Sequence, residues 1–173
     1  RVQKLKARFD TDWSTVDVMA NEAIQDINIV AGCLKQWFRE LPDPLLTYQL
    51  YPAFIEASKI ENDFLRQVRL HEQVNNLPDA NYATLRFLMA HLDRIRAHES
   101  INQMSAHNLA IVFGPTLLRS PHEAQMAGAG AAASHGGVGQ MYFPDMSLQC
   151  KAIETILLKY RDIFVESDED DLS

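Results

Sequence analysis

The chain has 173 residues, which is enough for one domain with a buried core, and a formal net charge of −7. It is 47% hydrophobic and 23% charged, as globular proteins are, and no apolar run is long enough for membrane insertion. Much of the negative charge comes from five residues near the C-terminal end: Glu166, Asp168, Glu169, Asp170 and Asp171. The rest of the chain is nearly balanced, which excludes a basic nucleic-acid-binding domain.

The first residues have the hydrophobic spacing of a helix, because Val2, Leu5 and Phe9 recur at intervals of three and four. No capping residue precedes them, and the chain begins with Arg1 rather than Met. We therefore expect this helix to continue from an upstream part of a longer protein.

Helical periodicity dominates the chain, and alternating strand patterns are scarce. We expect helices at roughly Gln25–Glu40, Leu50–Ile60, Asp63–Leu77, Asp79–His98, from Ser105 onward, and Met146–Phe164. Ser105 is a predicted N-cap, and Gly114-Pro115 is expected to break or kink the helix that follows it. The pattern predicts one all-α helical-bundle domain of about seven or eight helices over residues 1–166, with an acidic tail at 167–173.

An insertion over residues 121–144 differs in composition from the rest. Pro121 to Gln140 hold five of the seven glycines together with six alanines. With so few side chains large enough to pack, we expect a mobile loop of linker type.

The helix from Gln25 to Glu40 carries two stripes of residues. One is apolar and predicts the core-facing side: Ile27, Ala31, Leu34, Phe38 and Leu41. The other is small or polar: Asn28, Gly32, Lys35 and Arg39. Two cations one turn apart repel weakly, and a helical glycine costs about 1 kcal/mol relative to alanine. Residues that weaken their own helix indicate a docking surface for a negatively charged partner. The alternative is a solvated face with Glu40 or Asp43 as counter-charge.

Asn108 is the third helical residue after Ser105. Its amide has both a donor and an acceptor. One hypothesis is that it bonds only to the first turn of its own helix. The other is that it projects toward a binding partner.

Other chemistry finds no support in the sequence. The histidines have no metal-binding spacing, and the glycines at Gly128 and Gly130 follow no strand, so we expect neither a metal nor a cofactor. Cys33 has the spacing of a packing residue and lies far from Cys150, which indicates a reducing compartment such as the cytoplasm. No self-sufficient active site is evident.

Three segments are informative in both their order and their separation: Asp26–Tyr51 (DINIVAGCLKQWFRELPDPLLTYQLY), Leu77–Leu92 (LPDANYATLRFLMAHL) and Asn102–Arg119 (NQMSAHNLAIVFGPTLLR). Together they resemble the RhoGAP domain, which activates Rho-family GTPases. The amino-acid sequences of the first two segments are most similar to those of fungal members that carry an F-BAR module upstream.

The resemblance implies a helical domain whose groove binds a GTP-bound Rho, Rac or Cdc42-type protein in cytoskeletal signalling. It implies that Lys35 and Arg39 support this groove, that Asn108 contacts the GTPase or steadies a loop, and that Pro78 and Pro115 are structural. The domain is then a cytoplasmic activator acting in trans, brought to the cortex or membrane by other parts of its parent protein, and not an enzyme with a complete active site.

The family acts through an arginine finger that enters the active site of the GTPase. In the family this arginine lies in a G-[IL]-[FY]-R-x-S-G loop before the helix that RVQKLKARFD resembles, so we expect it upstream of Arg1, which does not take its role. Two alternatives remain. One is a GTPase-binding scaffold or sequestering module without stimulation, and the other is a helical interaction protein unrelated to GTPases.

Overall fold

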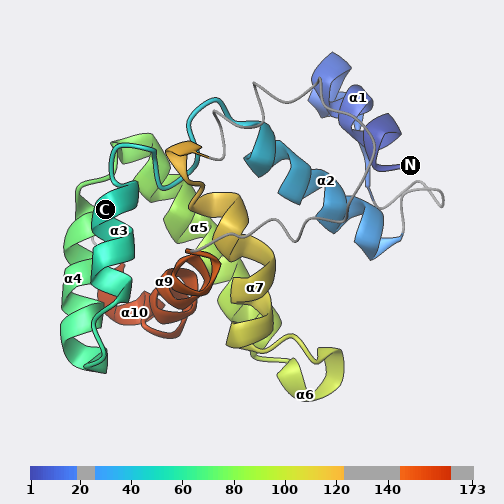
Figure 1. The fold of residues 1–173 in the computed structure, drawn as a ribbon. Coiled ribbons are helices and arrows are strands. Elements are labelled where there is room, and N and C mark those ends of the chain that lie inside the picture. Colours follow the sequence, from blue (N-terminus) through green and yellow to red (C-terminus); the bar gives the residue numbers. More distant parts are fainter. Residues whose placement is uncertain (19–25, 123–144, 165–173) are drawn as a thin grey trace, which may run out of the picture. The chain divides into compact units, whose positions relative to one another are not determined.

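The computed structural model describes residues 1–18, 26–122 and 145–164, and the chain divides into two compact units, Arg1–Pro42 and Asp43–Ser173 (Figure 1). Within the described ranges the regular elements are helical, without a strand. This confirms the predicted all-α class. Most of the Gly/Ala-rich insertion and the acidic tail lie outside the described residues. The single domain over residues 1–166 stays a prediction.

The first unit pairs two helices, α1 (Val2–Asp12) and α2 (Ile27–Glu40), with a 3-10 turn, η1 (Trp13–Thr15), after α1. Helix α2 begins at Asp26, whose carboxylate accepts the backbone N–H of Asn28 at 2.9 Å. The core of this unit consists of buried side chains from both helices and four partly buried valines: Leu5, Ile29 and Cys33, with Val2, Val16, Val18 and Val30.

The prediction that the apolar stripe of α2 faces the core is largely wrong. Ile27 is 72% exposed and Leu34 39% exposed, whereas Phe38 of the same stripe is buried as predicted. Helix α1 packs instead on the neighbouring face, where Ile29 and Cys33 lie. Two adjacent faces of α2 carry apolar residues, and the position of α1 decides which of them is buried.

The glycine at position 32 is explained by helix packing and not by docking of a partner. A Cβ added at this position would lie 3.1 Å from Cγ2 of Val2, which is tighter than ordinary van der Waals contact. The glycine therefore permits the close approach of α1 to α2, and its cost to helix stability is not evidence for a binding surface.

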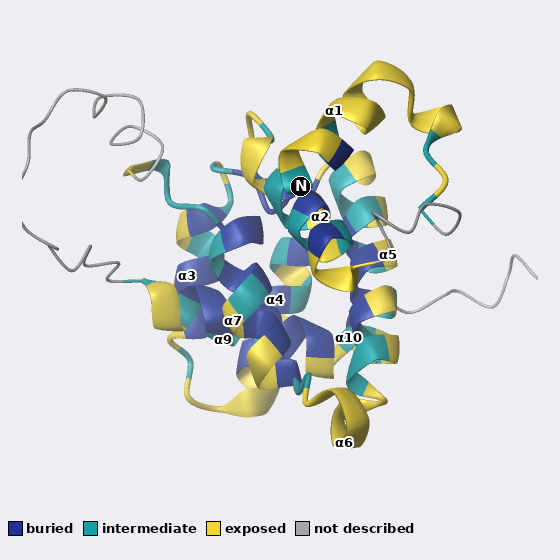
Figure 2. Cartoon of the chain, turned by 90° about the vertical axis from the view of Figure 1, so that its right-hand side faces the viewer, coloured by how far each residue is buried: buried dark blue, intermediate teal, exposed yellow. Residues whose placement is uncertain are grey.

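The second unit is built around one central helix. Its helices are α3 (Tyr51–Ser58), α4 (Asp63–Asn75), α5 (Asp79–Arg96), α6 (Glu99–Asn102), α7 (Ala106–Leu117), α9 (Met146–Leu158) and α10 (Tyr160–Ile163). Helix α9 contacts α3, α4, α5 and α7, and Figure 1 shows it in the middle of this unit. Its Ile153 and Ile156 are completely buried, and Figure 2 shows the buried residues concentrated along the helices around it.

Helix α7 does not break at Gly114-Pro115 but continues to Leu117. Its end is marked by the backbone N–H of Leu118, which donates to the carbonyl of Gly114 at 3.0 Å. A Cβ at Gly114 would lie 3.0 Å from both N and Cα of Cys150 in α9. Gly114 is therefore the point where the main chains of α7 and α9 meet, and a side chain there would push the two helices apart.

Arg66 of α4 is an unusual core residue because only 9% of it is exposed. Its guanidinium donates to the carbonyls of Ile60 (2.8 Å) and Glu61 (3.2 Å) beyond the end of α3, and to Thr155 Oγ1 of α9 (3.1 Å). It also pairs with Asp63. One side chain thus joins α4, α9 and the loop between α3 and α4.

Both cysteines are free and buried, as the packing interpretation of Cys33 predicted. Burial is the main cause that raises the pKa of each thiol, so the less reactive neutral form is favoured. Among the helices of the described ranges, none combines the length and apolarity that a membrane crossing requires.

Candidate functional site

Lys35 and Arg39 lie one turn apart on α2. Arg39 is exposed and Lys35 is partly exposed. Neither forms an ion pair with a described residue of the unit Arg1–Pro42, in which Lys6 pairs with both Asp10 and Glu40. The structure therefore brings two positive charges together on one helix face, with no ion-pair partner among residues 1–18 and 26–42.

The carboxylates proposed as counter-charges are already engaged by other groups. Glu40 accepts hydrogen bonds from Gln36 at 2.7 Å and from Lys6 at 3.1 Å. The hydrogen bond from Gln36, followed by the one from Lys6, lowers the pKa of Glu40. Asp43 accepts the backbone N–H of Tyr48 at 2.8 Å. Glu40 thus pairs with Lys6, and both the docking surface and the solvated face stay predictions for Lys35 and Arg39.

Asn108 lies in the second unit, near the start of α7. Ser105 caps this helix as predicted, because its hydroxyl accepts the backbone N–H of Asn108 at 3.1 Å. The Nδ2 atom of Asn108 donates to the carbonyl of Gln103 at 2.9 Å. Gln103 has a φ of 58°, a left-handed conformation that is uncommon outside glycine. The exposed Asn108 side chain therefore fastens the loop before α7, and within the described residues its Oδ1 has no hydrogen-bond donor.

Asn102, the last residue of α6, provides a contrast. It donates to the carbonyl of Ile95 in α5 at 2.9 Å, and its Oδ1 accepts the backbone N–H of Met104 at 2.8 Å. Both the donor and the acceptor of its amide are therefore engaged within the protein. Among the described residues, the Asn108 amide makes a hydrogen bond only through its Nδ2, so its oxygen remains available to a donor from a partner.

Lys35 and Arg39 thus lie together on α2 in the first unit, and Asn108 lies in the second unit.

The sequence analysis missed one feature of α2. Ile27, Leu34 and Trp37 are exposed on this helix at 72%, 39% and 49%, so apolar surface accompanies the two cations. The hydrophobic spacing was visible in the sequence but was assigned to the core. Within the described ranges, no three metal-ligating side chains converge.

Helices account for all the regular structure described, so the fold defines an all-α domain. The RhoGAP domain family matches residues 1–122, which is more than half of the chain. The chain therefore belongs to the RhoGAP domain family, as its motifs predicted.

The chain is similar to signalling proteins that are much longer. N-chimaerin of Rattus norvegicus is 50% identical over 126 residues, or 73% of this chain and 37% of the relative. Beta-chimaerin of Rattus norvegicus is 46% identical over 125 residues, 72% of this chain and 42% of the relative. The active breakpoint cluster region-related protein of Xenopus tropicalis is 46% identical over 127 residues, 73% and 14% of the two chains. The chain spans less than half of each relative. These matches do not support the fungal F-BAR-associated subtype.

Two solved structures share the fold. One is the crystal structure of the BH domain from GRAF, the GTPase regulator associated with focal adhesion kinase. It has a TM-score of 0.73 and 32% identity, and the match covers 94% of this chain and 77% of that one. The other is human Rho GTPase activating protein 15, with a TM-score of 0.73, 35% identity, and coverage of 94% and 69%.

Proposed function

We propose that this chain is the GTPase-binding part of an activator that binds GTP-loaded Rho-family proteins and stimulates their GTP hydrolysis. The supporting observation is the RhoGAP match over residues 1–122, within which Lys35 and Arg39 form a cationic face on α2 and pair with no described residue of their unit. The family and the free, buried cysteines favour action in the cytoplasm.

The chain's own contribution is recognition. A cationic face attracts an acidic partner, speeds the encounter and fixes orientation. The amide oxygen of Asn108 adds a hydrogen-bond acceptor from a helix start that Ser105 and Gln103 hold in place. The exposed apolar residues of α2 supply area that a partner can cover.

The chemical step belongs to an arginine finger, which stabilises charge on the transferring phosphoryl group and contributes roughly 10³ to 10⁵ in rate in the Ras case. The family loop that carries it is not found in residues 1–173. We therefore assign no arginine of this chain to that role, and we infer that the finger comes from the segment of the parent protein ahead of Arg1.

Single-turnover GTP hydrolysis on a Rho, Rac and Cdc42 panel tests this assignment. We expect residues 1–173 to bind the GTP-loaded form and stimulate weakly, and the parent protein with its preceding segment to stimulate by about 10³-fold or more. Strong stimulation by residues 1–173 alone would show that the finger assignment is wrong. Failure of the parent protein to bind any GTP-loaded member would refute the function.

The same assay distinguishes the activator from a second candidate function, that of a scaffold or sequestering module. A parent protein that binds GTP-loaded Rho proteins but leaves their hydrolysis rate unchanged would establish it.

The two asparagines give a paired prediction. Asn108→Ala removes the outward amide oxygen, and we expect it to weaken GTPase binding about five- to tenfold, as the loss of one partner hydrogen bond does. Asn102→Ala removes hydrogen bonds to α5 and to the loop before α7, and we expect it to lower the free energy of unfolding by about 1–2 kcal/mol with little effect on affinity. Isothermal titration and thermal melts of both variants measure this. An affinity loss confined to Asn102→Ala would contradict the role of Asn108.

A further inference from the structure

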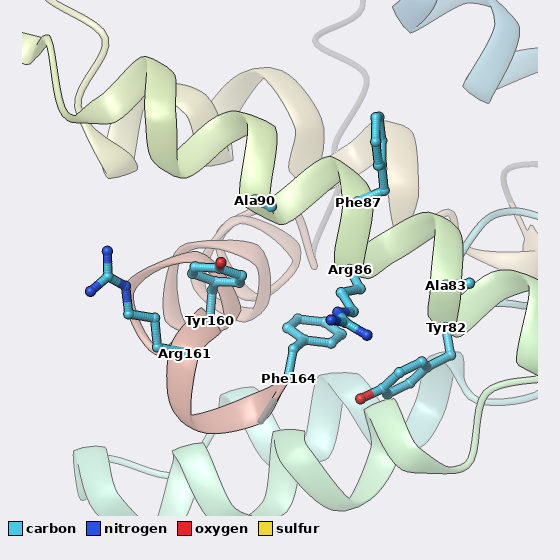
Figure 3. A pocket seen from close by; sticks show the side chains of 8 residues that line it. All are labelled: Tyr82, Ala83, Arg86, Phe87, Ala90, Tyr160, Arg161 and Phe164. Carbon is cyan, nitrogen blue, oxygen red and sulfur yellow. The ribbon is translucent and has the colours of Figure 1, made fainter. Parts of the chain in front are cut away.

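A cavity of about 630 Å³ lies in the second unit between α5 and the segment of α10 and Phe164 (Figure 3). Its size falls within the range of ordinary ligand pockets. The lining residues come from both elements: Tyr82, Ala83, Arg86, Phe87, Ala90, Tyr160, Arg161 and Phe164. None of the residues assigned above to GTPase binding is among them.

Aromatic rings form the apolar part of this cavity. The Phe164 ring is 4% exposed and lies 5.4 Å from the ring of Tyr82 and 6.3 Å from that of Tyr160, measured between centroids. Phe87 is 76% exposed at the same cavity. An apolar side chain of a ligand can therefore pack against a fixed aromatic floor and gain further contact at the rim.

The polar part of the lining consists of hydrogen-bond donors and positive charge. Among the lining residues that the structure describes there is no carboxylate. The neighbouring Asp162 is engaged elsewhere, because it accepts from Nε2 of Gln67 at 3.2 Å. The Arg161 guanidinium forms no ion pair with a described residue, and the hydroxyls of Tyr82 and Tyr160 make no hydrogen bond within the described ranges. These groups match a ligand that brings acceptors and negative charge.

We propose that this cavity binds a segment of another protein in which an aromatic or aliphatic side chain is flanked by carboxylates. The apolar side chain packs on Phe164 between the tyrosine rings, and the carboxylates accept hydrogen bonds from the two phenols and from Arg161. Charge complementarity selects this occupant, since a basic segment would meet like charge and a purely apolar one would leave the donors unpaired.

Fluorescence anisotropy with the full chain and a fluorescein-labelled peptide EDEFEDE tests the proposal. We expect saturable binding in the micromolar range, and binding at least tenfold weaker for the peptides EDESEDE and KRKFKRK. Arg161→Gln, and separately Tyr82→Phe combined with Tyr160→Phe, should each weaken the EDEFEDE complex about tenfold, because each removes donors to a charged acceptor. The tyrosine changes keep the rings and hence the packing, which thermal melts verify.

Lys159→Gln is the matched control. It removes the same charge two residues from Arg161, on an exposed side chain that does not line the cavity. We expect less than a twofold change. Equal losses from Lys159→Gln and Arg161→Gln, or binding of EDEFEDE that does not saturate, would overturn the proposal.

A variant of the full chain with Glu166→Gln, Asp168→Asn, Glu169→Gln, Asp170→Asn and Asp171→Asn tests the competing occupant. Equal affinity of EDEFEDE for this variant and for the unchanged chain supports a partner from another protein. Binding seen only after the acidic residues are neutralised would mean that the chain's own C-terminal segment occupies the cavity, and would overturn the proposal.

Discussion

Reversing both charges on α2, with Lys35→Glu and Arg39→Glu, should reduce the affinity for GTP-loaded Rho-family proteins by about 100-fold or more. Removing one partner of a buried interfacial charge pair typically costs 2–5 kcal/mol, and reversal adds repulsion against an acidic partner. Titration of the GTPase by isothermal calorimetry at two salt concentrations measures the loss. The affinity of the unchanged protein should fall as salt rises, whereas the reversed variant should show little salt dependence.

The chain offers a closely matched control on the neighbouring helix. Lys4 and Arg8 are also four residues apart and lie in the same unit; both are exposed, and neither forms an ion pair with a described residue of that unit. Lys4→Glu with Arg8→Glu changes the net charge by the same amount. We expect the affinity to change by less than about threefold if α2 is the contact face. Similar losses in the two double variants would show that net charge, and not the face of α2, governs binding.

Replacing Arg66 by leucine should lower the free energy of unfolding by about 3 kcal/mol. The change leaves the carbonyls of Ile60 and Glu61 and the hydroxyl of Thr155 without their buried donor, and each unsatisfied buried group costs about 1–3 kcal/mol. Leucine also supplies apolar area, which offsets part of this loss. Chemical denaturation followed by circular dichroism measures the difference.

Arg69 provides the comparison because it lies one turn further along α4. It is exposed and pairs with Glu72 at 2.9 Å on the surface. Arg69→Leu should change stability by less than about 0.5 kcal/mol, as expected for a solvated pair. If the two leucine variants unfolded at the same denaturant concentration, the hydrogen bonds of Arg66 would have no net stabilising effect.

Local signals predicted the helices well. The predicted cap at Ser105 marks the start of α7, since a side-chain oxygen next to free backbone N–H groups is a strictly local feature. Periodicity did not reveal which face of α2 is buried, nor that Gly32 and Gly114 are contact points between helices. Those properties depend on Val2 and on Cys150, which approach from other elements.

The sequence proposed the residues of the candidate site but could not predict their contacts. Motif resemblance selected Lys35, Arg39 and Asn108 from the sequence. The engagement of Glu40 by Lys6 and the bond from Asn108 to Gln103 follow only from the folded chain. The burial of Arg66 was equally hidden, because its partners include two main-chain carbonyls, which every residue possesses.

The hydrogen bonds at the loop between α6 and α7 restrict insertions and deletions in this part of the chain. Two hydrogen bonds join Asn108 to Ser105 and to Gln103, which precede it by three and five residues. Both bonds depend on this spacing. One residue inserted between Ser105 and Asn108 would rotate the asparagine by about 100° around α7 and carry its amide away from Gln103. Homologous chains that keep this amide in use are therefore expected to vary in spacing elsewhere and to conserve the count of residues here.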